Sequence, residues 1–140
     1  MQIEIYTDGS CKGNPGPGGW AAILVVNKQE ITLKGGEKHT TNNRMEMMAM
    51  IKALEYLKKG EAVPAEELNT TKIKIYSDSN LIVQTLTQNW KRKKNTDLWS
   101  DLDKARAWLD VDYIWVKGHS THVYNNRVDE IAQKEADKQR

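Results

Sequence analysis

Two segments of the chain alternate apolar and polar residues, and each of them ends in an aspartate. Residues 3–8 read Ile-Glu-Ile-Tyr-Thr-Asp, and residues 73–78 read Ile-Lys-Ile-Tyr-Ser-Asp. Alternation with a period of two is typical of strands. A carboxylate at the end of a central strand points into the crevice where α/β sheets place their ligands. We therefore expect an α/β fold with Asp8 and Asp78 at the functional edge of its sheet.

The rest of the chain supplies further strands and several amphipathic helices. Strands are expected at residues 20–26, 30–35 and 111–116, and helices at about 43–59, 79–89, 96–109 and 125–138. A turn-rich Gly/Pro connection is expected at 9–19, and a polar connection at 60–71. Three strands followed by alternating helices and strands predict a mixed sheet with helices packed against it. No repeat or linker is visible, so residues 1–140 are expected to form a single domain.

Composition excludes several classes of protein. A chain of 140 residues can bury one hydrophobic core without help from disulfides or a structural metal. The single cysteine excludes an internal disulfide and a cysteine-based zinc site, and it favours a reducing compartment. No apolar run is long enough to span a bilayer, and no signal segment opens the chain. The net charge of +2 is too small to identify a nucleic-acid binder. We expect a cytoplasmic monomer without a membrane partner.

Two more acids, Glu46 and Asp129, stand near the starts of predicted helices. Hard oxygen ligands from several elements suit Mg²⁺ or Mn²⁺, so the four acids together indicate metal-dependent phosphoryl chemistry. Each acid also has a purely structural interpretation. Glu46 follows Asn43 at the spacing of a capping box, Asp78 and Asp129 stand where helix dipoles favour acids, and Asp8 precedes a turn glycine.

Three other features bear on function. His119 follows a strand on a Gly-bounded loop, where it could exchange protons near neutral pH, whereas His39 and His122 are interpreted as ordinary loop histidines. The basic run 91–94 beside Trp90 has two interpretations. It is either an ordinary solvent-exposed charge cluster or a site that binds backbone phosphates while Trp90 stacks or packs beside it. The glycine-rich residues 13–19 lack the Gly-Lys-Ser/Thr ending of a nucleotide-binding loop and favour a tight turn that lets backbone approach a ligand.

Six motifs stand in collinear order between about Ile3 and Glu135. They are Tyr6-Thr7-Asp8-Gly9-Ser10-Cys11, Gly13-Asn14-Pro15-Gly16-Pro17-Gly18-Gly19-Trp20, Thr40-Thr41-Asn42-Asn43-Arg44-Met45-Glu46, Tyr76-Ser77-Asp78-Ser79, Trp115-Val116-Lys117-Gly118-His119 and Asn125-Asn126-Arg127-Val128-Asp129. Together they closely resemble ribonuclease HI, the type 1 ribonuclease H family. The first three are long and chemically unusual, so chance is a poor explanation.

The resemblance implies a fold and an activity. The fold is a five-stranded mixed sheet of order 3-2-1-4-5, with strands 1 to 3 antiparallel and helices on its faces. The activity is hydrolysis of the RNA strand of RNA–DNA hybrids with Mg²⁺, or Mn²⁺ as a substitute, and two ions in the site. Attack by water in line would leave a 5′-phosphate and a 3′-hydroxyl.

The resemblance also implies roles for particular residues. It makes Asp8, Glu46, Asp78 and Asp129 the metal-binding and catalytic acids, and it matches His119 to a loop histidine that assists proton transfer or product departure. Positions that meet the minor groove of the hybrid are matched by Cys11, Asn14, Asn42, Asn43 and Asn80. Ser79 and Arg44 lie beside them, and Trp90 corresponds to a tryptophan of the family's DNA channel.

The chain departs from many bacterial relatives in two places. The basic protrusion is reduced to residues 90–99, and the connection 60–71 is longer than the family pattern predicts. Three rivals stay open at this point: a strand-transfer or junction-cleaving enzyme on the same fold, a hybrid-binding module without catalysis, and the hydrolase domain of a viral polymerase. The last is disfavoured by a chain that starts at Met1 and looks complete.

Overall fold

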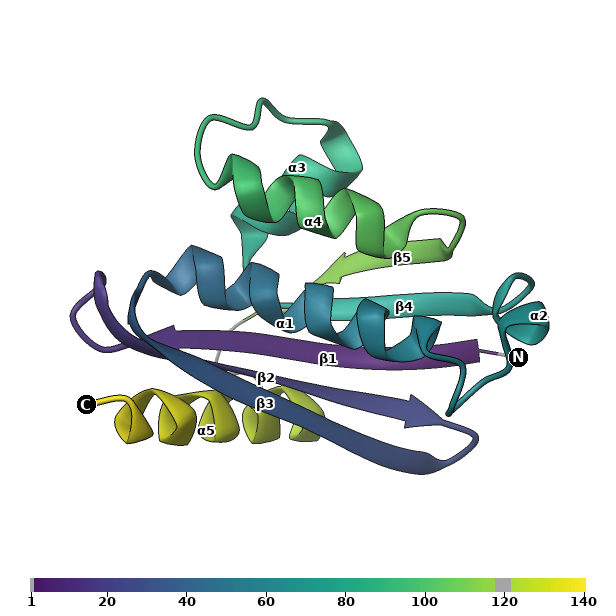
Figure 1. Cartoon of the computed structure of the whole chain (residues 1–140), viewed down its shortest axis with the longest axis horizontal. Coiled ribbons are helices and arrows are strands. Elements are labelled where there is room, and N and C mark those ends of the chain that lie inside the picture. The colour runs from purple at the N-terminus through teal and green to yellow at the C-terminus, as the bar shows by residue number, and fades with distance from the viewer. Residues whose placement is uncertain (1, 118–121) are drawn as a thin grey trace.

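The two alternating segments are neighbouring parallel strands at the centre of one mixed sheet (Figure 1). The computed structural model describes residues 2–117 and 122–140. The sheet order is β3-β2-β1-β4-β5, which confirms the expected order 3-2-1-4-5. The elements are β1 (Gln2–Cys11), β2 (Gly16–Val26), β3 (Gln29–Thr40), α1 (Asn42–Lys58), α2 (Ala65–Leu68), β4 (Lys72–Ser77), α3 (Asn80–Gln88), α4 (Thr96–Arg106), β5 (Asp110–Trp115) and α5 (Val123–Lys138).

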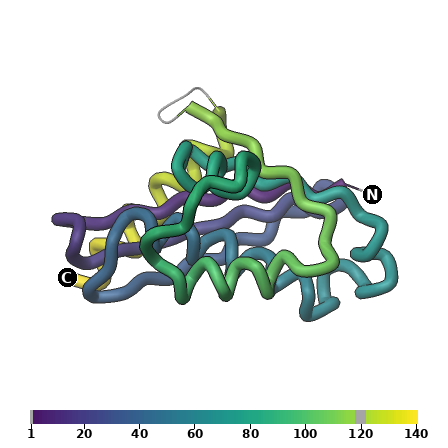
Figure 2. The backbone as a smooth tube through the Cα atoms, turned by 90° about the horizontal axis from the view of Figure 1, so that it is seen from above, coloured from purple at the N-terminus to yellow at the C-terminus, as the bar shows by residue number. Residues whose placement is uncertain are grey.

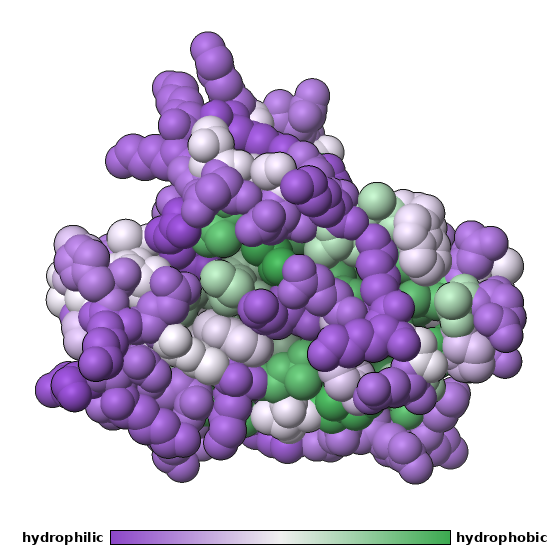
Figure 3. All heavy atoms as spheres, viewed as in Figure 1, coloured by the Kyte–Doolittle hydropathy of each residue, from purple (hydrophilic) through white to green (hydrophobic). Residues whose placement is uncertain are grey.

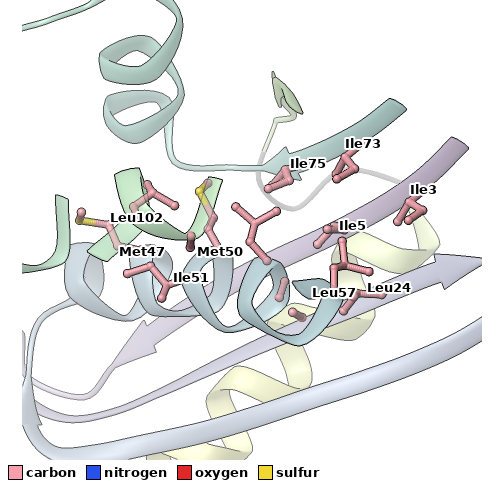
Figure 4. Close-up of a cluster of buried hydrophobic side chains, with 14 of the residues drawn as sticks. Ile3, Ile5, Leu24, Met47, Met50, Ile51, Leu57, Ile73, Ile75 and Leu102 are labelled. Atoms are coloured by element: carbon pink, nitrogen blue, oxygen red, sulfur yellow. The ribbon is translucent and has the colours of Figure 1, made fainter. Parts of the chain in front are cut away.

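Helices cover both faces of the sheet, as Figures 1 and 2 show. On one face, α1 and α4 enclose the main core, in which Ile3, Ile5, Ile73 and Ile75 of the two central strands are fully buried beneath Met50 of α1 (Figure 4). Burying each such side chain stabilises the fold by about 1.5–3 kcal/mol. On the other face, α5 packs on a smaller cluster, which consists of Tyr6, Ala21, Ile23, Val128 and Ala132.

The prediction of a turn-rich connection at residues 9–19 is wrong for most of that segment. Strand β1 continues to Cys11 and β2 starts at Gly16, so the connection is only four residues long. Gly13 does turn the chain, with φ of 93°, but Gly9, Gly18 and Gly19 allow close packing instead. A Cβ at Gly19 would collide with the backbone of α5 at Ala132, and a Cβ at Gly18 would collide with Thr40. Glycine in a sequence usually indicates a turn, but these glycines let neighbouring helices lie close to the sheet.

Other boundaries differ from expectation by a few residues. The helix expected to end at 109 ends at Arg106, because Trp108 has a left-handed backbone with φ of 57°. The polar connection 60–71 contains α2, and it buries Val63 and Leu68 in the main core. It therefore holds the start of β4 and the end of α1 together as part of the fold.

The surface is largely hydrophilic on the face that Figure 3 shows. Apolar side chains are visible between α1 and the lobe formed by α3 and α4, and hydrophilic side chains project at the joint between those two helices. Among residues 2–117 and 122–140, no helix is both long and apolar enough to cross a membrane.

Candidate active site

Three of the predicted acids form a tight cluster at the carboxyl ends of the central strands. Asp8 lies near the end of β1, Asp78 directly follows β4, and Glu46 lies in the second turn of α1. Each offers a carboxylate oxygen, and these oxygens lie within 4.8 Å of one another. Asp8 and Glu46 are buried, whereas Asp78 is half-buried. Asp129 of α5 interacts with Asp8 from the other face of the sheet, but the tight cluster consists of Asp8, Glu46 and Asp78.

Glu46 reaches this cluster because the first turn of α1 lies directly against β1 at Gly9. A Cβ at Gly9 would lie 2.6 Å from the carbonyl carbon of Met45 and would also collide with the backbone nitrogen of Glu46. Real Cβ atoms do not approach backbone so closely, so the position requires glycine. The cap of the helix is Thr41, whose Oγ1 accepts from the Arg44 backbone N–H at 3.3 Å. Glu46 is therefore not the partner of Asn43 in a capping box.

The cluster holds its protons strongly. Burial raises the pKa of Asp8 to about 8, an interaction with the Glu46 side chain opposes the rise, and the Asp78 charge and the Asp129 side chain add to it. The Gly9 backbone N–H donates to Asp8 Oδ1 at 2.9 Å and opposes this rise. Burial also raises the pKa of Glu46 well above its ordinary value, and the negative charge of Asp8 adds to the effect. The site favours a compensating positive charge.

The chemistry of these side chains fits a hard divalent cation. Oε2 of Glu46 is buried and has no hydrogen-bond partner in the structure, although a buried carboxylate oxygen is normally paired. Three carboxylates from separate elements supply oxygen ligands of the type that Mg²⁺ and Mn²⁺ prefer. A cation between them would provide the missing partner for Glu46 and remove the mutual repulsion.

Four of the predicted substrate contacts gather beside the cluster. Cys11 ends β1, and its Sγ–H donates to the carbonyl oxygens of Thr40 at 3.2 Å and Gly16 at 3.4 Å. Asn14 lies in the β1–β2 turn, and its Oδ1 accepts from the backbone N–H of Asn42 at 2.9 Å. Asn42 and the neighbouring Asn43 are exposed in the first turn of α1. The turn and the helix start thus form one surface of amide groups.

The other predicted contacts are spread around the site. Asn80 starts α3 two residues after Asp78 and accepts from Gln84 Nε2 at 3.3 Å. Trp90 follows α3 and is 46% exposed. His119 lies outside the described residues.

Some neighbours of the acids were not singled out from the sequence. Gln133 Nε2 donates to Asp129 Oδ2 at 2.9 Å and holds that carboxylate from the next turn of α5. The spacing of four residues on a predicted helix is the signal that could have identified Gln133. Trp115 Nε1 donates to the carbonyl oxygen of Asp78 at 3.2 Å and fixes the backbone there. No local pattern marks that contact, because the two residues lie on different elements.

A five-stranded 3-2-1-4-5 sheet, with acids from both of its faces gathered at the strand ends, defines the ribonuclease H fold class. The chain belongs to the RNase H family, whose sequence model matches residues 1–137. As a member of that family it is an enzyme, a hydrolase of the endoribonuclease class.

Named relatives and solved structures agree with this membership. Ribonuclease H of Hahella chejuensis is 48% identical, over 93% of this chain and 90% of that protein. Ribonuclease H of Caulobacter sp. is 46% identical, over 94% of this chain and 88% of that protein. The solved structure of LC11-RNase H1 in complex with an RNA/DNA hybrid superposes with a TM-score of 0.81 at 27% identity, over 97% of both chains.

Proposed function

We propose that this protein hydrolyses the RNA strand of RNA–DNA hybrids and leaves 5′-phosphate and 3′-hydroxyl ends. Relatives at 46–48% identity carry the name Ribonuclease H, and one solved neighbour is a complex with an RNA/DNA hybrid. The observation that carries the proposal is the carboxylate cluster with its unpartnered Glu46 oxygen. Crowded buried carboxylates are costly for a fold, and metal-assisted chemistry on an anionic phosphodiester gives them a use.

The metal-binding role falls to Asp8, Glu46, Asp78 and Asp129. These residues would hold two Mg²⁺ ions, or Mn²⁺ in their place. When bound, such ions neutralise charge on a phosphodiester, lower the pKa of an attacking water and stabilise the leaving 3′-oxygen. The chain contributes the placement of the acids: β1 carries Asp8, β4 leads directly into Asp78, and the Gly9 contact brings Glu46 beside them.

Recognition of RNA requires contact with the 2′-hydroxyl, which is both a donor and an acceptor. Asparagine amides offer both functions. Asn14 lies in the hairpin turn and bonds the backbone of Asn42, and Asn42 and Asn43 stand about one helical turn before Glu46. We infer that these residues, Cys11 and Asn80 at the start of α3 read the sugar edge of the hybrid. Minor-groove contacts read base identity poorly, so sequence preference should be weak.

His119 completes the proposal as a residue for proton transfer or product departure, on the strength of the resemblance. An imidazole titrates near neutral pH and can accept a proton from water or donate one to a leaving oxygen. His119→Ala should lower kcat more than it raises KM, since the effect falls on the chemical or release step.

Cleavage of an end-labelled hybrid tests the activity. The purified protein should cut the RNA strand with Mg²⁺ or Mn²⁺ and should be inactive in EDTA. Asp78→Asn should lower kcat by about 100-fold or more, the size of effect seen when a group that stabilises developing charge is removed. Asp101→Asn is the matched control, because Asp101 is an exposed aspartate of α4. Full activity of Asp78→Asn would refute the role of the cluster.

The substrate distinguishes this proposal from a general nuclease on the same fold. Replacing the RNA strand by DNA, or methylating the 2′-hydroxyls around the cleavage site, should stop the reaction. Equal cleavage of hybrid and duplex DNA would instead support a nuclease that does not read the sugar. Product ends are tested by ligation, which requires the proposed 5′-phosphate and 3′-hydroxyl.

A further inference from the structure

The joint between α3 and α4 is fixed at both of its ends. Residues 89–95 form this joint, which lies at the edge of the α3–α4 lobe in Figure 1. Asn89 and Asn95, its first and last residues, have left-handed backbones with φ of 57° and 59°. Asparagine is among the few residues that adopt this conformation readily. The backbone therefore turns at two defined points, and the basic run lies between them.

Arg92 is the one basic residue of the joint that turns back onto α4. Its Nη1 donates to Asp103 Oδ2 at 2.6 Å, and its guanidinium lies 4.7 Å from the centroid of the buried Trp99 ring. Asp103 also accepts from Nε and Nη2 of Arg106, at 3.3 and 3.1 Å. The Arg92 guanidinium lowers the pKa of Asp103. A phosphate could engage Arg92 only after this ion pair and this ring contact were broken.

A second arginine ties the end of the joint to α1. Arg44 donates from Nη1 and Nη2 to the two carboxylate oxygens of Asp97, at 2.9 and 2.7 Å. Its Nη1 also donates to Asn95 Oδ1 at 3.3 Å. Paired bonds of this kind restrict orientation as well as distance. Because Arg44 stands two residues before Glu46, the joint is held to the helix that carries a candidate metal ligand.

The three lysines of the joint are exposed, in contrast to the half-buried Arg92. The joint borders a groove of about 330 Å³ whose floor includes Met47, Ile82 and Trp99, and Asn43 lies at its edge. The lysines Lys91, Lys93 and Lys94 line this groove, and so does Arg92, but the Arg92 guanidinium is already paired with Asp103. The groove starts at Asn43, one of the residues proposed to contact the sugar. Positive charge along such a groove suits the phosphates of a bound strand.

We propose that Arg92 and Arg44 are positioning residues that hold the joint so that Lys91, Lys93 and Lys94 meet the phosphates of a bound hybrid. Arg92 is not itself a phosphate contact. This inference rests on the proposed function for its ligand. The physical reason is preorganisation: lysines on a loose loop would lose backbone and side-chain freedom on binding, whereas a fixed loop has already lost it.

A pair of variants separates the two kinds of basic residue. Arg92→Met and Lys93→Met each remove one positive charge and keep an unbranched stem. The dissociation constant of a fluorescent hybrid is measured in EDTA across a salt series. Lys93→Met should lower the slope of log Kd against log salt by about one. Arg92→Met should weaken binding by about fivefold with no change of slope. A loss of one unit of slope in Arg92→Met would overturn the proposal.

The partner of Arg92 gives a test in which charge and positioning predict opposite signs. Asp103→Asn removes a negative charge, so a simple electrostatic effect would tighten hybrid binding. Loss of positioning would weaken it instead, and the double variant R92M/D103N should be no weaker than R92M alone. Tighter binding by Asp103→Asn would refute the inference. Thermal midpoints of all variants, measured in parallel, verify that each is folded at the assay temperature.

Cleavage kinetics separate failure of this inference from failure of the proposed function. With an active wild type, Arg92→Met should raise KM more than it changes kcat. Contacts away from the reacting atoms stabilise the bound substrate and the transition state equally, so their loss weakens binding without slowing the chemical step. A wild type that binds hybrid but does not cut it would refute the proposed activity, and the salt slopes would still decide the role of Arg92. A wild type that cuts hybrid, with equal slope losses for Arg92→Met and Lys93→Met, would refute only the positioning role.

Discussion

Replacing Asp8 by asparagine should stabilise the metal-free protein while removing its activity. Asp8 is 3% exposed and faces Glu46, Asp78 and Asp129. An asparagine keeps Oδ1 as the acceptor for the Gly9 N–H, and its amide N–H can donate to a neighbouring carboxylate. The substitution replaces a buried group that can ionise by a neutral one, without removing a hydrogen bond that the backbone needs.

The size of the effect follows from the raised pKa. In the unfolded chain an aspartate ionises near its ordinary value of 3.8, and in the folded protein Asp8 does so at about 8. The stability that the protonated carboxyl contributes is fully present below the unfolded pKa and is lost as pH rises through the folded pKa. Each pH unit of that interval is worth about 1.4 kcal/mol, so at pH 7 the loss approaches about 4 kcal/mol. Asparagine avoids this loss, and relaxation of the site reduces the gain to about 1–4 kcal/mol.

Thermal unfolding in EDTA between pH 4 and pH 8.5 measures this gain. The free energy of unfolding of the wild type should fall as pH rises, and that of Asp8→Asn should fall less steeply, with a Tm at pH 7 higher by about 3 °C per kcal/mol. Added Mg²⁺ should raise the wild-type Tm and leave the variant nearly unchanged, because a bound ion stabilises only a protein that holds it. Asp101→Asn controls for net charge. The reasoning is refuted if Asp8→Asn is less stable than the wild type at pH 7 while the control is unaffected.

Three further substitutions test single features of the structure. Trp108→Gly should be more stable than Trp108→Ala by about 1 kcal/mol in chemical denaturation, because glycine, unlike alanine, adopts a φ of 57° without strain. The usual order, with alanine more stable, would contradict the left-handed backbone. Gly9→Ala should lower stability by about 1–3 kcal/mol, since the added Cβ displaces the start of α1. It should also lower the Mg²⁺ affinity measured by calorimetry, and an unchanged affinity would argue against the contact. Asn14→Ala removes the acceptor of the Asn42 N–H and should lower stability by less than about 1.5 kcal/mol. It should also raise KM for hybrid by several-fold, and an unaltered KM would exclude Asn14 as a contact to the 2′-hydroxyl.

Much of the sheet could be predicted because its signals are local. Period-two alternation identified β1 and β4, and period 3.6 identified the core face of α1. The order of the five strands came from the motif resemblance. The resemblance also selected the four acids, three of which the structure brings together in one cluster, although every one of them had a structural interpretation by itself. Spacing could not show that Thr41, and not Asn43, caps α1, since either side chain satisfies the same backbone groups.

What the sequence could not show depends on partners far apart in the chain. Glycines 9, 18 and 19 have the same local signature as turn glycines, and their role appears only once α1 and α5 lie against the sheet. Arg92 has the same composition signal as the lysines beside it, yet it pairs with Asp103 eleven residues away. In both cases the residue type is unremarkable, and the tertiary neighbour decides its function.

The site is assembled by strand register. In the parallel pairing of β1 and β4, Ile3 lies opposite Ile73, Ile5 opposite Ile75 and Tyr6 opposite Tyr76. An aspartate follows each tyrosine by two residues, so matched strands deliver Asp8 and Asp78 to the same edge of the sheet. A slip of one residue would turn the isoleucines out of the core, and burial of the core therefore enforces the pairing of the carboxylates. The free energy that folds the centre of the sheet thus also holds together carboxyl groups whose ionisation burial and mutual repulsion oppose until a cation binds.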